Sequence, residues 1–171
     1  MKMIDVGEKP RTARRAVARG FVAMAPSTVA IVRRGAAEKG DVLAAARLAG
    51  IMAAKKTPDL LPLCHPIALS GVEVLARTRR GGIEVTATVR TVDRTGVEME
   101  ALSAAAAGCL TVYDMLKRYE RGMRIEALEL VEKEGGRSGH WRRSAGALSR
   151  PRPAPSAGRG ASGRSPRRRG R

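Results

Sequence analysis

Two alternating runs on either side of Gly81-Gly82 constrain the fold of this chain more than any other feature. Apolar side chains alternate with mostly polar ones from Val72 to Ala76, and again from Ile83 to Val89. A period of two is typical of strands with one buried face. A connection of two glycines favours a tight hairpin turn. The two strands therefore pair antiparallel, which excludes a purely parallel α/β sheet.

Helix and strand signals alternate along the rest of residues 1–144. Asp41 is expected to cap a helix that ends by Thr57, because Pro58 disfavours a helical residue before it. Ser27 is expected to cap a short helix through Arg34. The order Thr95-Gly96-Val97-Glu98 matches a capping box and predicts a long helix to about Tyr119. Further strands are expected over 15–24 and 124–132, and an irregular loop over 57–66. The fold class is therefore α+β.

The charge of the chain is unevenly distributed. Eight arginines and no acidic residue lie in residues 145–171, so +9 of the net charge of +17 remains for residues 1–144. Residues 145–171 consist largely of Ala, Gly, Ser, Pro and Arg, a composition that cannot offset its ordering entropy by burial. We expect one catalytic domain over 1–144 and a disordered tail over 145–171, with at most weak contact to nucleic acid. The charge of the domain itself fits a phosphate-bearing small molecule or a nucleic acid.

Composition excludes several classes of protein. Aromatic residues make up only 2%, so stacking of bases on aromatic side chains cannot be the main activity. The two cysteines lack metal-ligand spacing, and no long apolar run suits a membrane span. The simplest expectation is a cytoplasmic protein with reduced thiols, no bound metal and no membrane partner.

Four groups of residues could carry chemistry. His65, between Cys64 and Pro66, could transfer a proton or be a structural loop histidine. Asp114 and Lys117 lie three apart on one helix face, as an acid–base pair or as a surface ion pair. Lys39 and Lys133 stand beside glycines and could bind phosphate or lie in ordinary turns.

Glu98 and Glu100 form the fourth group, at the start of the long helix, where capping explains Glu98 without any further role. Glu100 and Asp114 would be about 21 Å apart along an unbroken helix. They cannot both reach one small reacting centre in a single subunit. A shared site would span a long ligand or be completed by another subunit.

Eight segments in this order closely resemble the molybdenum cofactor biosynthesis protein C family, from about Met3 to Gly139. They are Met3–Val6, Lys39–Val42, Ala49–Ile51, Ala53–Thr57, Leu61–Pro66, Thr95–Leu102, Tyr113–Met115 and Gly135–Gly139. The resemblance implies a ferredoxin-like two-layer sandwich with a largely antiparallel sheet, assembled as a hexamer of three dimers. It also implies sites at dimer interfaces, which would resolve the distance between Glu100 and Asp114.

The implied activity is that of a phosphorus–oxygen lyase of molybdenum cofactor biosynthesis. It would convert (8S)-3′,8-cyclo-7,8-dihydroguanosine 5′-triphosphate to cyclic pyranopterin monophosphate and release diphosphate. No tightly bound cofactor is expected, although Mg²⁺ could accompany the triphosphate. The alternative is a basic nucleic-acid-binding domain.

The resemblance also assigns residues. Asp114 and Lys117 match the catalytic positions. The matched substrate-binding positions are Leu63, Cys64, His65, Glu98, Met99 and Glu100, together with Lys39, Lys55 and Lys133, which would hold the triphosphate. Lys56 could satisfy the motif in place of Lys55. The Arg-rich end departs from the family, in which the chain ends sooner and is less basic.

Overall fold

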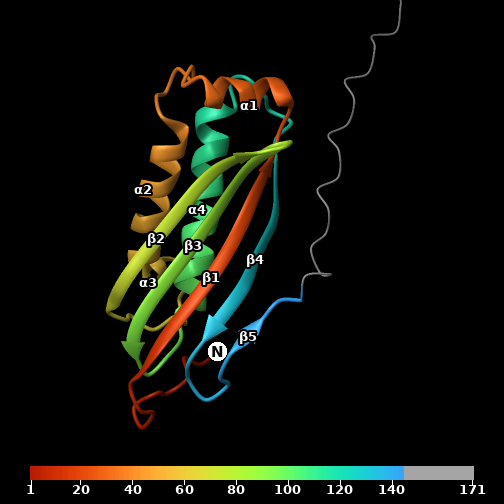
Figure 1. Cartoon of the computed structure of the whole chain (residues 1–171). Helices are drawn as coiled ribbons and strands as arrows, with labels where there is room; N and C mark the ends of the chain where they lie inside the picture. Colours follow the sequence, from red (N-terminus) through yellow and green to blue (C-terminus); the bar gives the residue numbers. More distant parts are fainter. Residues whose placement is uncertain (145–171) are drawn as a thin grey trace, which may run out of the picture.

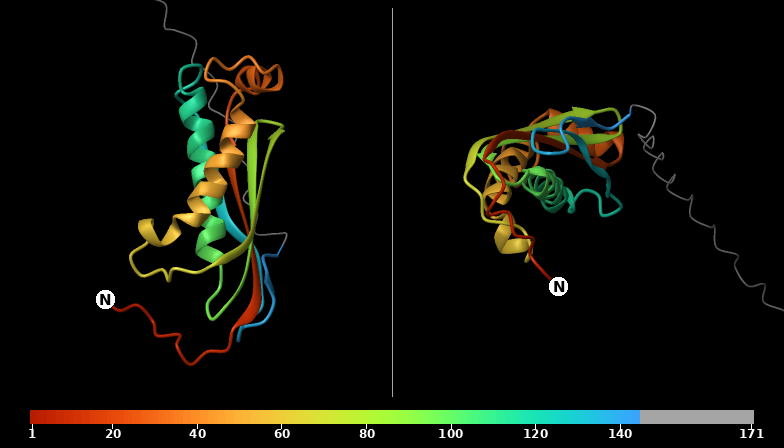
Figure 2. Two further views of the ribbon diagram at one scale, coloured as in Figure 1. Left: turned by 90° about the vertical axis from the view of Figure 1, so that its left-hand side faces the viewer. Right: turned by 90° about the horizontal axis from the view of Figure 1, so that it is seen from below.

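The structure is a computed structural model that describes residues 1–144, and the expected disordered tail over 145–171 lies outside them. One face of a five-stranded sheet is covered by helices, as Figure 2 shows from the side. The strands follow the order β2-β3-β1-β4-β5, and every neighbouring pair is antiparallel. The first four strands and the two long helices form the split βαβ pattern of a ferredoxin-like sandwich. The expected α+β fold is confirmed.

The elements are labelled in Figure 1. Their bounds are β1 Thr12–Ala23, α1 Pro26–Arg33, α2 Val42–Lys55, α3 Thr57–Leu60, β2 Leu69–Arg79, β3 Gly82–Asp93, α4 Glu98–Leu116, β4 Arg124–Glu134 and β5 Trp141–Arg142. None of the helices among the described residues combines the length and apolarity that crossing a membrane requires.

The hairpin of β2 and β3 forms as the alternating pattern predicts. Gly81 occupies the turn with φ +81°, a conformation that glycine adopts without the steric cost of a Cβ atom. From Ile83 to Val89, every second side chain of β3 is fully buried against the helices. No helix of residues 1–144 covers the other face of the sheet (Figure 2).

Helices α2 and α4 pack closely because small residues meet at their crossing. A Cβ atom added to Gly50 would lie 2.9 Å from the carbonyl oxygen of Ala104, and one added to Gly108 would lie 3.3 Å from that of Ala46. The expected close approach of the Ala-rich helix is therefore an approach to α2 within the same chain.

The structure contradicts two of the three predicted helix caps and part of the predicted loop over 57–66. Asp41 does cap α2, accepting a hydrogen bond from the Ala44 amide at 2.9 Å. In contrast, α1 begins after Ala25 with Pro26 in its first turn, so Ser27 is not the cap. Helix α4 begins after Val97 without a side-chain cap, so Thr95 and Glu98 do not form a capping box. Residues 57–60 form the short helix α3, because Pro58 suits a first helical turn.

Candidate active site

The residues expected to form the site lie at opposite ends of α4. Glu98, Met99 and Glu100 are in its first turn, and Asp114 is in its last. The helix is unbroken, so Glu100 and Asp114 are about 21 Å apart at 1.5 Å per residue. Figure 2 shows the start of α4 near the N-terminal segment and its end near α1. The expected site residues of one chain therefore form two separate groups, which we call half-sites.

The first half-site is a cavity of about 740 Å³ beside the start of α4. It brings together all the residues expected to hold the base of the substrate except Glu100, which lies buried behind the wall. The lining residues are Met1, Leu61, Pro62, Leu63, Cys64, His65, Thr95, Gly96, Glu98 and Met99. Leu63 and Met99 are 50% and 42% exposed. Such exposed apolar side chains are suited to contact a planar ring.

Glu100 and Cys64 form a buried pair at this cavity. Glu100 is 1% exposed, and the Cys64 thiol donates to its Oε1 atom at 3.5 Å. Burial raises the pKa of Glu100, whose Oε2 atom has no partner among the described residues. Burial, the nearby Glu100 charge and this hydrogen bond raise the pKa of Cys64 to about 11. The Cys64 thiol, which lines the cavity, is therefore protonated at neutral pH, and this state disfavours it as a nucleophile.

Asp114 lies between two lysines at the second half-site. Its carboxylate oxygens are 2.6 Å from Lys39 Nζ and 2.8 Å from Lys117 Nζ. Hydrogen bonds from Lys117 and then Lys39 lower the pKa of Asp114 to about 2, and Asp114 in turn raises the pKa of Lys117. Lys39 comes from the loop before α2. The sequence predicted the pair Asp114–Lys117 but not this third member, which is 75 residues away.

Lys55 and Lys56 differ in their partners. Lys56 Nζ pairs with Asp59 at 3.2 Å in α3. Lys55 has no ion pair among the described residues and lies exposed at the last turn of α2. Its free ammonium favours Lys55 over Lys56 as the position that binds an anion.

A second cavity of about 780 Å³ adjoins the first, because Thr95 lines both. Its walls combine the N-terminal segment with the glycine-rich loop after β4. The lining residues are Glu8, Lys9, Pro10, Thr12, Arg14, Arg94, Thr95, Gly136, Arg137 and Ser138. Lys133 lies at its edge and donates to the Ser138 hydroxyl. Sequence reasoning missed Lys9, Arg14 and Arg94, because no local motif marks them, whereas Arg137 lies in the glycine-rich segment Gly135–Gly139 that it singled out.

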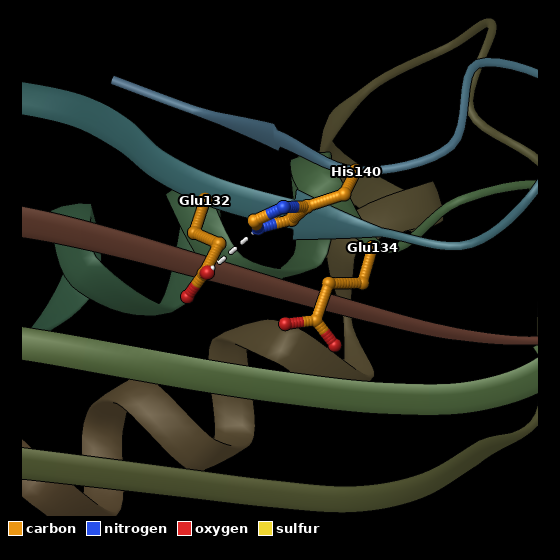
Figure 3. A group of neighbouring side chains, drawn as sticks. All are labelled: Glu132, Glu134 and His140. Atoms are coloured by element: carbon orange, nitrogen blue, oxygen red, sulfur yellow. Dashed lines mark hydrogen bonds and ion pairs between the residues drawn. The ribbon is translucent and has the colours of Figure 1, made fainter. Parts of the chain in front are cut away.

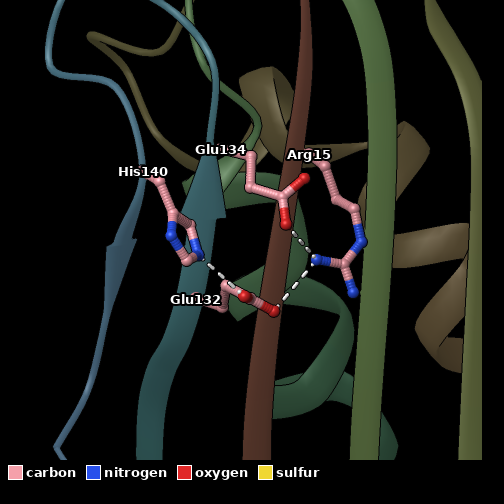
Figure 4. A network of polar contacts seen from close by, with 4 residues as sticks. All are labelled: Arg15, Glu132, Glu134 and His140. Carbon is pink, nitrogen blue, oxygen red and sulfur yellow. Dashed lines mark hydrogen bonds and ion pairs between the residues drawn. The ribbon is translucent and has the colours of Figure 1, made fainter.

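Near the same loop, Glu132, Glu134 and His140 bring three metal-ligand atoms within 4.8 Å of one another (Figure 3). Arg15 Nη1 lies 3.0 Å from Glu132 and 3.1 Å from Glu134, and His140 lies 2.8 Å from Glu132 (Figure 4). Since the guanidinium bridges both carboxylates, it supplies the positive charge that a metal ion would bring. We interpret this cluster as a structural network of ion pairs and hydrogen bonds that holds β1, β4 and the residue before β5 together.

Comparison with known proteins identifies the family of the chain. The MoaC family model matches residues 3–136. A cyclic pyranopterin monophosphate synthase from Thermomicrobium roseum is 60% identical over 144 residues, which cover 83% of this chain and 87% of the relative. Proteins of the same name from Cereibacter sphaeroides and Methylobacterium sp. are each 57% identical. Their matches cover 84% and 81% of this chain, and 91% and 88% of the relatives.

Proposed function

The chain belongs to the MoaC family, and from this membership we propose that it has the activity for which its relatives are named, cyclic pyranopterin monophosphate synthesis in molybdenum cofactor biosynthesis. The substrate is the 3′,8-cyclised dihydro-GTP. The products are cyclic pyranopterin monophosphate and diphosphate. Identity of 60% over 83% of the chain is the observation that carries this proposal.

Asp114 and Lys117 supply the acid–base chemistry of this proposal. The paired lysines keep the pKa of Asp114 low, so its carboxylate is ionised at neutral pH but is a weak base while both lysines bind it. The raised pKa of Lys117 keeps its ammonium charged and able to hold a phosphate oxygen. Lys39 completes the triad and balances the charge of the carboxylate.

The cavity at the start of α4 holds the ring system of the substrate. His65 orients it or relays a proton, and Glu100 accepts hydrogen bonds from donors on the guanine edge. The unpartnered Oε2 atom of Glu100 supports this role, because a buried acceptor without a partner is costly unless a ligand satisfies it. Lys55 and Lys133 add positive charge, and Mg²⁺ could accompany the triphosphate.

A complete site needs two chains in this proposal. Asp114 and Glu100 cannot approach each other within one chain, because α4 is a continuous helix between them. We therefore propose that Asp114, Lys117 and Lys39 of one subunit face the cavity of another, within a hexamer of three dimers. The cytoplasmic location stays a prediction.

Turnover of the cyclised nucleotide tests the proposal. We expect the protein to release diphosphate from it, and Asp114→Asn or Lys117→Ala to lower kcat about 100- to 10,000-fold. The control is Asp59→Asn, which removes an exposed carboxylate paired with Lys56 elsewhere. Normal turnover by both site variants would reject the catalytic assignment. No turnover by the unaltered protein would reject the function.

A further inference from the structure

We propose that Tyr119 is a positioning residue, whose hydroxyl group holds the loop before α2 so that Lys39 reaches Asp114. The inference rests on the proposed function, in which Lys39 completes a triad with Asp114 and Lys117. Tyr119 lies outside the eight segments that resemble the family, so no motif points to it. Its role depends instead on a contact between residues that are 81 positions apart in the sequence.

The loop before α2 is anchored at both ends and exposed between them. Ala37 is 7% exposed, and the Asp41 side chain caps α2. In contrast, Glu38, Lys39 and Gly40 are exposed. Ordering a long lysine side chain costs conformational entropy, which an exposed segment does not offset by packing. The position of Lys39 therefore depends on contacts with another element.

The turn after α4 provides these contacts. The Glu38 amide donates to the Tyr119 hydroxyl oxygen at 2.9 Å, and Arg118 pairs with the Glu38 carboxylate. The next residue of the loop, Lys39, donates to the Asp114 carboxylate at 2.6 Å. The backbone contact of Tyr119 is thus one residue away from the lysine that binds the catalytic carboxylate.

The turn is itself fixed to α4, so Tyr119 keeps a constant position relative to Asp114. The Tyr119 amide donates to the carbonyl oxygen of Leu116 at 2.8 Å, and the Leu116 side chain is fully buried. The Glu38 amide and the Lys39 ammonium therefore bind one rigid unit at two points. Two such contacts restrict the loop more than the exposed ion pair of Lys39 alone, and restricted geometry is what a reacting group requires.

A neighbouring contact shows what a merely structural role at this turn looks like. The Glu120 carboxylate accepts hydrogen bonds from the Ala25 amide at 2.9 Å and from the Thr28 hydroxyl at 2.7 Å, and so ties the turn to the start of α1. Tyr119 lines the cavity of about 280 Å³ beside Asp114, whereas Glu120 and Thr28 do not. Of the two ties, the one made by Tyr119 acts on Lys39.

The titration of Asp114 in the full-length protein without substrate tests the positioning. Hydrogen bonds from Lys117 and then Lys39 lower the pKa of Asp114 to about 2, and Glu38 and Arg118 are the other charged groups that line its cavity. We expect Tyr119→Phe to raise this pKa toward its value in Lys39→Met, because Lys39 is then free to move away. Carbon-13 NMR with labelled aspartate measures the pKa, since the chain has five aspartates and Asp114→Asn identifies the signal. Circular dichroism at each pH restricts the comparison to folded protein.

Thr28→Val is the matched control, because it also removes one hydroxyl group from a hydrogen bond to the same turn. We expect it to leave the pKa of Asp114 unchanged. Tyr119→Phe should fold, since the Glu38 amide that it frees is exposed and can bind water. An Asp114 pKa that is the same in Tyr119→Phe and the unaltered protein, or that Thr28→Val raises equally, overturns the positioning role.

Turnover separates this role from the proposed function. We expect Tyr119→Phe to lower kcat/KM for the cyclised nucleotide about 2- to 10-fold, the equivalent of one hydrogen bond. It should have no further effect in a chain that already carries Lys39→Met. An equal loss in both backgrounds would mean that Tyr119 does not act through Lys39. No turnover by the unaltered protein would reject the proposed function, whereas an Asp114 pKa that depends on Tyr119 would still support the positioning.

Discussion

At the scale of single residues, the pair of Cys64 and Glu100 shows how burial sets chemical behaviour. Neither residue type is unusual in sequence, and a lone cysteine such as Cys64 is expected to be a small buried apolar side chain more than a nucleophile. The structure places the thiol against a buried carboxyl group, and burial is the largest cause of both raised pKa values. The thiol therefore keeps its proton at neutral pH, which suits recognition more than attack.

We predict that Cys64 reacts slowly with iodoacetamide at neutral pH, because its pKa is about 11 and the thiolate is the reactive form. Glu100→Gln removes the charge and the hydrogen bond that help to raise this pKa. The midpoint of the rate profile should then fall to lower pH, while burial still keeps it above that of a free thiol. Mass spectrometry of the Cys64 peptide across pH measures the shift.

Two controls accompany this experiment, a second variant and a second cysteine. Glu98→Gln removes a charge in the same helical turn without touching the thiol, so it should move the midpoint less. Cys109 is fully buried, with its pKa raised to about 12, and should stay unmodified. A profile that is identical in Glu100→Gln and the unaltered protein would contradict the proposed coupling.

Sequence patterns predicted the contact of a side chain only where its partner is close in the sequence. The Asp41 cap is made within three residues, so the sequence was sufficient to predict it. Lys39 and Asp114 meet across 75 residues, and Arg14 takes its position from carbonyls 79 and 80 residues away. No spacing rule encodes such contacts. The positions that matched the family were found by resemblance, whereas Arg14 and Arg94 required the fold.

At the scale of elements, the contact between α2 and α4 determines how the half-sites are held. Lys39 precedes α2, Lys55 ends it, and α4 carries Glu100 and Asp114. Both helices are rich in alanine, so their backbones approach closely at Gly50 and Gly108. The helical periodicity predicted both elements, but their contact face and the small strand β5 depend on tertiary packing.

We predict that Gly50→Ala destabilises the protein although alanine is the better helix former. The new methyl group would lie 2.9 Å from the Ala104 carbonyl oxygen and 3.0 Å from the Val74 side chain. Overpacking costs about 1–3 kcal/mol, whereas helix propensity returns about 1 kcal/mol. The free energy of unfolding, measured in urea, should therefore fall by up to about 2 kcal/mol. A Cβ atom added at Gly122 would have no heavy atom within 4 Å. Gly122→Ala should therefore change the free energy of unfolding by less than about 0.5 kcal/mol. If Gly50→Ala instead raised the free energy of unfolding, α2 and α4 would be able to move apart to accept the methyl group at no cost.

At the scale of the whole molecule, the distribution of charge separates binding surfaces from structural ones. Arg15, Arg19 and Arg79 pair with glutamates on neighbouring strands of the sheet. Four cations without an ion pair in residues 1–144 line the cavity near the N-terminal segment, whereas others, such as Arg33 and Lys55, lie elsewhere. A concave group of cations suits a small anion, whereas an extended nucleic acid would contact an open basic face. The net charge alone could not separate these hypotheses, because paired and unpaired cations count equally in it.

The separation of the half-sites along α4 leads to a prediction about mixed assemblies. If each complete site takes Asp114 from one subunit and Glu100 from another, Asp114→Asn and Glu100→Gln are each inactive alone. After the two are denatured, mixed in equal amounts and refolded together, a mixed dimer contains one intact site and one doubly altered site. Random pairing should then restore about a quarter of the unaltered activity.

Diphosphate release from the cyclised nucleotide measures this recovery, and light scattering checks that the refolded samples have the same oligomeric state. Each variant refolded alone is the control and should stay inactive. The pair Asp114→Asn and Lys117→Ala should recover nothing, because Lys117 bonds to Asp114 within the same half-site and every mixed site then lacks one of them. Failure of the first pair with normal assembly would mean that one chain brings both ends of α4 to the substrate, which the continuous helix opposes. Recovery by the first pair and not by the second therefore locates the chemistry between subunits.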